Sequence, residues 1–281
     1  MATLQDRRRI LGPTDTVRLG YTNKEPEDEE QIAAEGADEA KSDRTRERPS
    51  DELRRLFLKQ GLVSNANGSA YIEIGDIQLQ CTVSGPMPIR GSFQTEADLS
   101  VEAKFSPFDE QKHGVAGASG IEKSIAAFIH TAISPSIMLE QYPKSAINIL
   151  VSIISSSENT KSLLYAAITA TSVALIDSGI SVRDVVTAGS VLIARDGANK
   201  HQIYDDPEYA PAESDIDAVV SYMAARNNEI TGIWSEGGNI SPAELDEIFK
   251  HTKSMAGQIR TLVNGLLLED FKNKEQSVAE N

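Results

Sequence analysis

The sequence is poor in cysteine, in positive charge and in long apolar runs, and each shortage excludes a class of protein. Cys81 is the single cysteine in 281 residues. A lone thiol cannot form an internal disulfide, which argues against a disulfide-stapled secreted scaffold and favours a reducing compartment. We expect Cys81 to be a small buried apolar side chain. The four histidines are scattered without metal-ligand spacing, so we predict no metal site and no bound cofactor.

Acidic residues outnumber basic ones, which gives a formal net charge of -15 and an isoelectric point near 4.7. A free-standing nucleic-acid binder usually presents a basic surface, because neutralising phosphates supplies most of its affinity. Any RNA contact of this chain must therefore be local and shared with partner chains. The longest apolar run, Leu163–Ile176, is interrupted by Thr and Ser and is too short to cross a bilayer. We expect a soluble protein without a membrane partner.

Composition also suggests how the chain is divided. Residues 22–50 are rich in charge and almost free of large apolar side chains, so we expect a disordered acidic segment there. It separates an N-terminal arm, residues 1–21, from a folded domain over residues 51–271 and a polar tail over 272–281. Hydrophobic residues make up 40% of the chain, which is enough to pack the core of that domain.

The pattern of the folded part predicts an α/β (α+β) protein with mixed sheets and packed helices. Strands are predicted over Ala70–Ile74, Ile77–Val83, Ala97–Phe105, Ala146–Ile154, Val185–Ala194, Ala218–Ala225 and Glu229–Trp234. Helices are predicted over Gly120–Ile133, over Lys161–Ser178 and from Ser241 onward.

Local signals refine these boundaries. Gly75-Asp76 is a hairpin dipeptide between the first two strands, and the second strand is expected to end at Gly85-Pro86. Gly179 is a plausible helix stop. Ser241 and Glu244 have the spacing of a capping box. The polar stretch Asp205–Asp217 is interpreted as a loop between strands.

Three segments taken together resemble RNase PH-like ring subunits of the eukaryotic RNA exosome. They are QDRRRILGP at 5–13, NGSAYIEIGDIQLQCTVSGPMPIRGSF at 67–93 and YPKS at 142–145. The resemblance implies an RNase PH-like domain in a six-membered ring with other RNase PH-like subunits. It also implies an S1-domain cap protein, hydrolytic exoribonuclease subunits and single-stranded RNA in the assembled pore as partners. The expected function is in RNA processing, including rRNA processing, and in RNA degradation. The expected locations are the nucleus, the nucleolus and the cytoplasm.

The same resemblance bears on catalysis. Active relatives carry aspartates on the strand and turn that correspond to Tyr142–Thr160, where carboxylates place a metal or protonate the leaving group. Aligned without gaps, this chain has Leu150 and Ser152 on the strand and Ser155–Ser157 in the turn. We therefore expect no catalytic residues and a non-catalytic structural subunit. The alternative is an active phosphorolytic 3′-to-5′ exoribonuclease that uses Glu158 as a displaced acid. An unrelated α/β protein with accidental motif matches is a third hypothesis.

Two sets of basic residues are candidates for contacts. Arg90 and Lys144 could face the pore and contact RNA, or they could be solvated or paired at an interface. Arg7, Arg8 and Arg9 could dock the arm on a neighbouring subunit or cap, since arginine pairs well with carboxylates at interfaces. A nucleic-acid patch or a nuclear address is the alternative for those three arginines.

Overall fold

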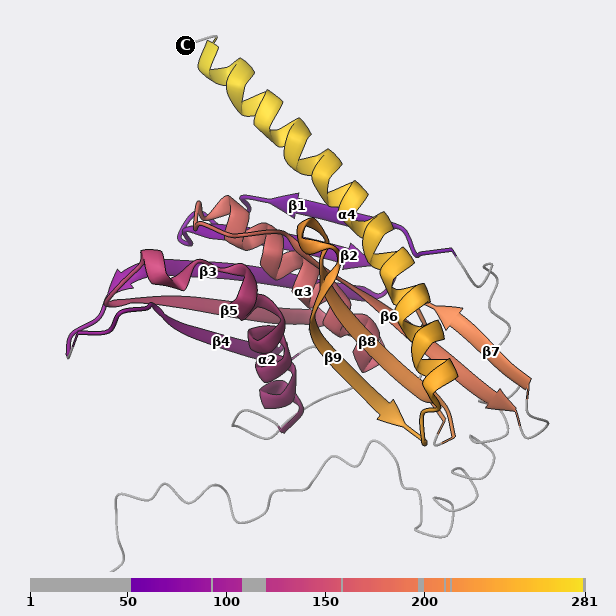
Figure 1. Cartoon of the computed structure of the whole chain (residues 1–281). Helices are drawn as coiled ribbons and strands as arrows, with labels where there is room; N and C mark the ends of the chain where they lie inside the picture. Colours follow the sequence, from indigo (N-terminus) through magenta and orange to yellow (C-terminus); the bar gives the residue numbers. More distant parts are fainter. Residues whose placement is uncertain are drawn as a thin grey trace, which may run out of the picture. The chain divides into compact units, whose positions relative to one another are not determined.

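The computed structural model describes residues 52–91, 93–107, 120–157, 159–196, 200–209, 211–212 and 214–279, which form nine strands and three long helices (Figure 1). The strands are β1 (Leu56–Gln60), β2 (Gly68–Ile74), β3 (Ile77–Pro88), β4 (Asp98–Phe105), β5 (Ser145–Ser155), β6 (Val186–Asp196), β7 (Lys200–Asp205), β8 (Ile216–Met223) and β9 (Glu229–Gly237). The helices are α2 (Gly120–Ile133), α3 (Thr160–Asp177) and α4 (Pro242–Ala279), with short 3-10 turns η1 (Ser134–Ser136), η2 (Leu139–Gln141) and η3 (Ala224–Arg226).

The strands form two sheets. The first has the order β1-β2-β3-β5-β4 and is antiparallel except for the parallel pair β4 and β5. The second has the order β7-β6-β8-β9 and is antiparallel throughout. The predicted α/β fold with mixed sheets and packed helices is confirmed.

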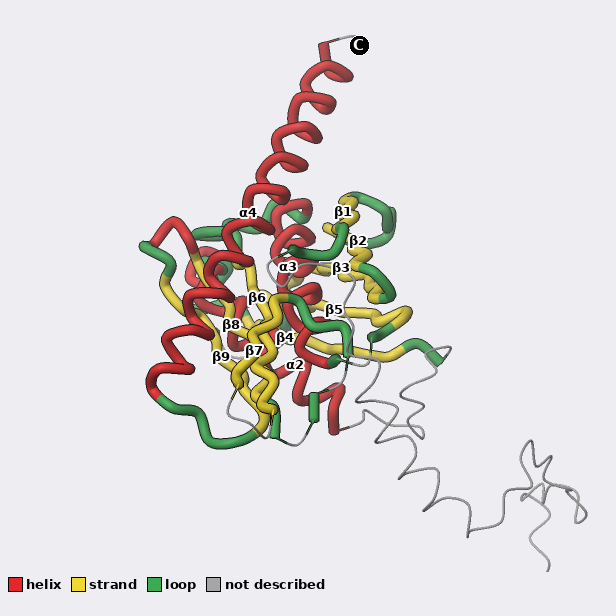
Figure 2. The backbone as a smooth tube through the Cα atoms, turned by 90° about the vertical axis from the view of Figure 1, so that its right-hand side faces the viewer, coloured by secondary structure: helices red, strands yellow, loops and turns green. Residues whose placement is uncertain are grey.

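Helices α2 and α3 lie between the two sheets, and α4 covers the opposite face of the second sheet (Figures 1 and 2). Because α3 contacts β2 and β3 on one side and β6 and β8 on the other, every residue from Lys161 to Leu175 is buried. The many Ala and Ser residues of α3 allow this close approach. β2 comes so near that a Cβ on Gly68 would overlap the backbone of α3, with Ser178 Cα only 2.7 Å away.

Several local predictions are confirmed. Gly75, at φ 56°, turns the β2–β3 hairpin, in which Ile74 pairs with Ile77. Gly179 has φ 73° just after α3, the left-handed conformation that ends many helices. Ser241 and Glu244 form the capping box: the Ser241 amide donates to the Glu244 carboxylate at 2.7 Å, and the Glu244 amide donates to the Ser241 hydroxyl at 3.3 Å.

The strands differ from the prediction in three ways. β1 and β7 were not predicted, because LFLKQ and KHQIYD lack a clear apolar alternation. β3 does not end at Gly85-Pro86: a register shift between Ser84 and Met87 lets it continue to Pro88. The supposed loop Asp205–Asp217 is shorter than expected, because β8 begins at Ile216 and includes Asp217.

The first sheet is tied to the second through a buried ion pair. Arg54, just before β1, donates from Nε to Asp206 Oδ2 at 2.8 Å and from its backbone amide to the same oxygen at 3.0 Å. Tyr165 of α3 donates to Asp206 Oδ1 at 2.8 Å. Although burial opposes it, this network raises the pKa of Arg54 above its ordinary value and lowers that of Asp206.

Cys81 lies in the core as expected, and its thiol donates to Thr171 at 3.6 Å. Burial raises the pKa of this thiol to about 12. The proposed arm, the acidic segment and Arg7, Arg8 and Arg9 lie outside the described residues, so the domain division stays a prediction. No helix in the described part of the chain is long and apolar enough to span a membrane.

Candidate functional site

The turn that follows β5 is the first place to look for chemistry, because active relatives are expected to place aspartates there. Ser156 and Ser157 are buried, and the Ser157 hydroxyl donates to the Asn159 carbonyl at 3.2 Å. Asn159 caps α3: its side-chain oxygen accepts from the amides of Lys161 at 2.7 Å and Ser162 at 3.2 Å. Glu158, the alternative acid, lies outside the described residues. The first turn of α3 is therefore capped by a neutral amide.

Lys161 points from this first turn of α3 toward the second sheet. Its side chain is 1% exposed, and Nζ lies 2.7 Å from Glu236 Oε2 on β9. The same ammonium stands 4.6 Å above the centre of the Trp234 ring. Trp234 in turn packs edge-on against Phe128 of α2, with ring centres 5.4 Å apart. An acid and an aromatic face thus hold the lysine from the same edge strand.

Asp217 completes this cluster from β8, where it pairs in register with Glu236 of β9. It is 2% exposed, and its Oδ1 has no hydrogen-bond partner among the described residues. Burial raises the pKa of Asp217 to about 7, and the positive charge of Lys161 and a hydrogen bond from Asn159 only partly offset that effect. Asp217 is thus a buried carboxyl group that titrates near neutral pH.

The nearby Asp215 has a different role. Its Oδ1 accepts from the Arg195 amide at 3.1 Å, and its Oδ2 accepts from the Ala212 amide at 3.0 Å. These bonds fix the turn that leads into β8. Asp215 is therefore a structural acid, held by the backbone.

A carboxyl group with a pKa near neutrality beside an ammonium is the kind of pair that acid–base catalysts use. Here, however, Asn159, Lys161 and Asp217 are all buried, and Lys161 is already paired. Sequence reasoning missed Asp217 because the surrounding stretch was interpreted as a loop. The usable signal was Asp-Ile-Asp directly before an apolar run, since two-residue spacing places both acids on one face of a strand.

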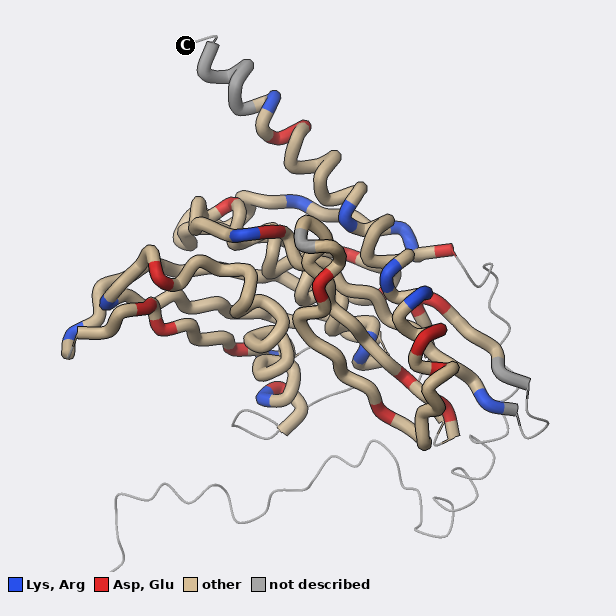
Figure 3. Tube along the Cα trace, in the orientation of Figure 1, with Lys and Arg blue, Asp and Glu red and all other residues tan. Residues whose placement is uncertain are grey.

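The second place is the connection between β3 and β4, which brings the two predicted RNA-contact residues together. Lys144 has φ 56°, and its carbonyl accepts from the Ile89 amide at 3.1 Å. Its own amide donates to the Gln94 carbonyl, also at 3.1 Å. The backbone of Lys144 therefore bridges both stems of the loop that contains Arg90. Both basic side chains are exposed at this end of the first sheet, where Figure 3 shows basic residues in blue.

Sequence reasoning did not single out the apolar neighbours of this basic pair. Phe93, in the same connection, is 72% exposed, and Met87, near the end of β3, is 44% exposed. An exposed aromatic ring beside basic side chains is a combination that binds single-stranded nucleic acid, because bases stack on rings while cations hold phosphates. The only hint in the sequence was Phe93 standing in a polar, glycine-containing loop. Within the described residues no cluster of three metal-ligating side chains exists.

Comparison with known proteins places the chain in a family. Residues 52–181 match the model of the RNase PH family, described as "3' exoribonuclease family, domain 1". The chain is 33% identical over 277 residues to "Exosome complex component mtr3" of Schizosaccharomyces pombe, covering 97% of this chain and 100% of that protein. It is 28% identical to the Chaetomium thermophilum component MTR3, covering 86% and 90%. The archaeal component Rrp41 of Nitrosopumilus maritimus is 35% identical, but over 50% of this chain.

Solved structures agree on the fold. Rice Rrp46 superposes with a TM-score of 0.66 at 18% identity, covering 79% of this chain and 98% of that chain. A chain of the Archaeoglobus fulgidus exosome with RNA bound to the active site gives 0.64 at 18% identity, covering 82% and 97%. The chain therefore belongs to the 3′ exoribonuclease (RNase PH) family and, within it, to the Mtr3-type components of the exosome complex.

Proposed function

We propose that this protein is a non-catalytic structural subunit of the exosome core ring, which supports 3′-to-5′ RNA processing and degradation carried out by other subunits. Its ring neighbours would be other RNase PH-like chains. An S1-domain cap protein would sit on the ring, and hydrolytic exoribonuclease subunits would receive the threaded RNA. The proposed locations are the nucleus, the nucleolus and the cytoplasm.

The observation that carries the non-catalytic proposal is the burial of Lys161. Its ammonium lies against Glu236 and Trp234, beside Asp217, directly after the turn where carboxylates are expected in active relatives. Phosphorolysis needs a place for inorganic phosphate and for the scissile phosphodiester, together with groups that offset their charge. In this chain the ammonium of Lys161 is already paired, and the carboxyl group of Asp217 is buried. The cluster therefore serves to join α3, β8 and β9.

Contact with RNA is proposed for the exposed loop. Arg90 and Lys144 would attract the phosphates of a strand passing the end of the first sheet, and Phe93 would offer a ring for base stacking. A small basic site suits a chain of net charge -15, because the remaining surface can face protein partners.

The rival proposal is an active phosphorolytic exoribonuclease, and one observation favours it: a carboxyl group with a pKa near 7 is suited to protonating a leaving group. The test is release of nucleoside diphosphates from single-stranded RNA, with and without inorganic phosphate, by the full chain reconstituted with its ring partners. An active RNase PH-like enzyme in the same buffer is the positive control.

The proposal expects the reconstituted ring to release the same amount of diphosphate with the wild-type chain and with Asp217→Asn. Phosphate-dependent release that Asp217→Asn abolishes, while the exposed-site control Asp98→Asn keeps it, would establish the enzyme. Comparing the variants inside one ring separates catalysis by this chain from catalysis by a neighbour.

A further inference from the structure

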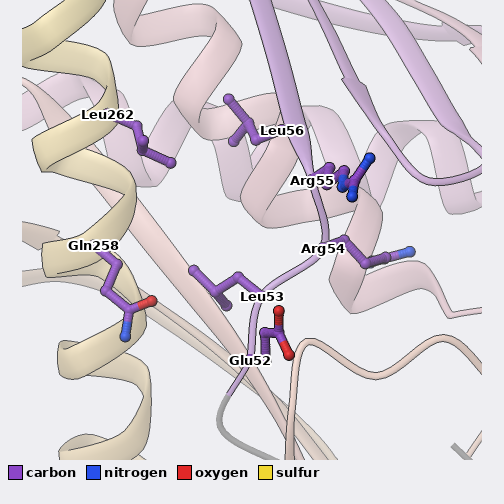
Figure 4. Close-up of a pocket in the computed structure, with 7 residues that line it drawn as sticks. All are labelled: Glu52, Leu53, Arg54, Arg55, Leu56, Gln258 and Leu262. Carbon is purple, nitrogen blue, oxygen red and sulfur yellow. The ribbon is translucent and has the colours of Figure 1, made fainter. Parts of the chain in front are cut away.

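A groove runs along α4, on the side that faces the segment leading into β1. It consists of two adjoining hollows that share Gln258. One, of about 730 Å³, is lined by residues 52–56 together with Gln258 and Leu262 (Figure 4). The other, of about 450 Å³, is lined by Asp205, Lys250, His251, Ser254 and Gln258. The two hollows have different chemistry.

One face of α4 lines both hollows. Residues 250, 251, 254, 258 and 262 fall within about a third of a turn of one another, because a helix advances by 100° per residue. The first three are polar, Gln258 stands at the junction, and Leu262 ends the series. The helix thus offers a polar-to-apolar strip along a single groove.

The polar end carries an exposed cation, Lys250. No described acidic side chain forms an ion pair with Lys250, which is exposed. The acid of this hollow, Asp205, is buried and is engaged by His251, whose Nδ1 lies 3.0 Å from Oδ1 and 3.3 Å from Oδ2. Lys250, Ser254 and Gln258 can all donate hydrogen bonds. This end therefore fits a negatively charged group.

The apolar end is formed by leucines from two elements. Leu262 is 54% exposed and points across the groove toward Leu53 and Leu56 (Figure 4). Arg54 and Arg55 also line this hollow, but their guanidinium groups point away from the leucines in the same view, and Arg54 is paired with Asp206. Glu52 lines the same hollow, next to Leu53 (Figure 4). This end fits a medium-sized apolar side chain.

We propose that this groove binds an extended segment of a partner protein that carries a carboxylate and, a few residues away, a leucine-like side chain. The eight helical steps from Ser254 to Leu262 span about 12 Å, which an extended peptide covers in about four residues. The carboxylate lies against Lys250 and Ser254, and the apolar side chain lies among Leu53, Leu56 and Leu262. Lys250, which forms no ion pair with a described residue, supplies the positive charge that complements the carboxylate of the partner.

The experiment is selection of random peptides displayed on phage against the full chain, followed by binding of a synthetic copy of the winning peptide, measured by fluorescence anisotropy. We expect a consensus of Asp or Glu and an apolar residue three to five positions apart. Lys250→Glu and Leu262→Asp should each weaken that peptide by roughly tenfold or more, the loss of one well-placed contact. The matched controls Lys253→Glu and Leu268→Asp, exposed on the same helix outside the groove, should change affinity by less than about twofold.

A basic consensus, no enriched peptide, or equal affinity for the groove variants and their controls would overturn the proposal. Tight binding of an oligo(A) RNA that Lys250→Glu abolishes would also overturn it, in favour of a phosphate site. Circular dichroism of each variant checks that the fold is retained. Because ring assembly is measured separately, failure of this docking site leaves the proposed structural function standing, and the reverse also holds.

Discussion

Lys161 Nζ and Glu236 Oε2 are 2.7 Å apart, although the lysine side chain is 1% exposed and the glutamate side chain is 57% exposed. The pair joins the first turn of α3 to β9, an edge strand of the second sheet. Its charge also acts on Asp217, the neighbour of Glu236 across the strand pair. The pair and Asp217 therefore link α3, β8 and β9 at the start of α3.

The burial of Asp217 should make the unfolding free energy depend on pH. Its pKa rises from 3.8 to about 7 on folding, so the folded state holds a proton that the unfolded state releases between these values. Stability from this group is present below about pH 4 and is lost as the pH rises toward 7. Chemical denaturation should show Asp217→Asn gaining roughly 2–4 kcal/mol relative to the wild type between pH 4 and pH 8. Parallel pH profiles for the two proteins would contradict the assignment.

Replacing Arg54 should lower the stability of the fold far more than replacing its neighbour Arg55. Arg54 is 7% exposed and bonds Asp206, whose side chain is fully buried, whereas Arg55 is exposed. Arg54→Met leaves a buried carboxylate unpaired and should cost about 3–5 kcal/mol of unfolding free energy. Arg55→Met should stay within about 0.5 kcal/mol. Equal urea midpoints for the two variants would show that the ion pair does not anchor the segment before β1.

Alanine substitutions at two glycines, one tightly packed and one exposed, test the packing of β2 against α3. Gly68→Ala puts a methyl group into the backbone of α3 and should destabilise the fold by about 1–3 kcal/mol. Gly257→Ala meets no atom within 4 Å on an exposed turn of α4 and should stabilise the fold by about 0.5–1 kcal/mol. Thermal melts of both variants check the signs, and a stable Gly68→Ala protein would mean that β2 lies farther from α3.

Reversing Arg90 and Lys144 tests the RNA-contact proposal. In a reconstituted ring the double change to Glu should weaken single-stranded RNA binding for all sequences alike. It should also lower the slope of log affinity against log salt by about 0.7 for each lost phosphate contact. Lys123→Glu, an exposed lysine on α2, is the control. Unchanged affinity and slope would place the loop away from RNA.

Periodicity and turn chemistry were enough to predict most of the fold. α2 has the predicted bounds, and the hairpin at Gly75 and the cap at Ser241 form as their residue types require. β1 and β7 were missed because a strand at the edge of a sheet contacts few neighbours and need not alternate. Their pairing comes from tertiary contacts, which local patterns do not encode.

The candidate sites also differ in how far local sequence could predict them. Arg90 and Lys144 were found because isolated basic residues stand out in an acidic chain, and backbone hydrogen bonds bring their two loops together. Asp217 could not be linked to Lys161, because the two are 56 positions apart and meet only when β8 packs on α3. Long-range contacts of this kind depend on topology rather than on local sequence.

The measurement that tests the central claim most directly is native mass spectrometry of the tagged chain purified from its own source, with every partner identified. A structural ring subunit should be recovered in a stoichiometric complex with other RNase PH-like chains, S1-domain caps and a hydrolytic nuclease. Recovery of the chain alone, or as a homo-oligomer, would contradict the account.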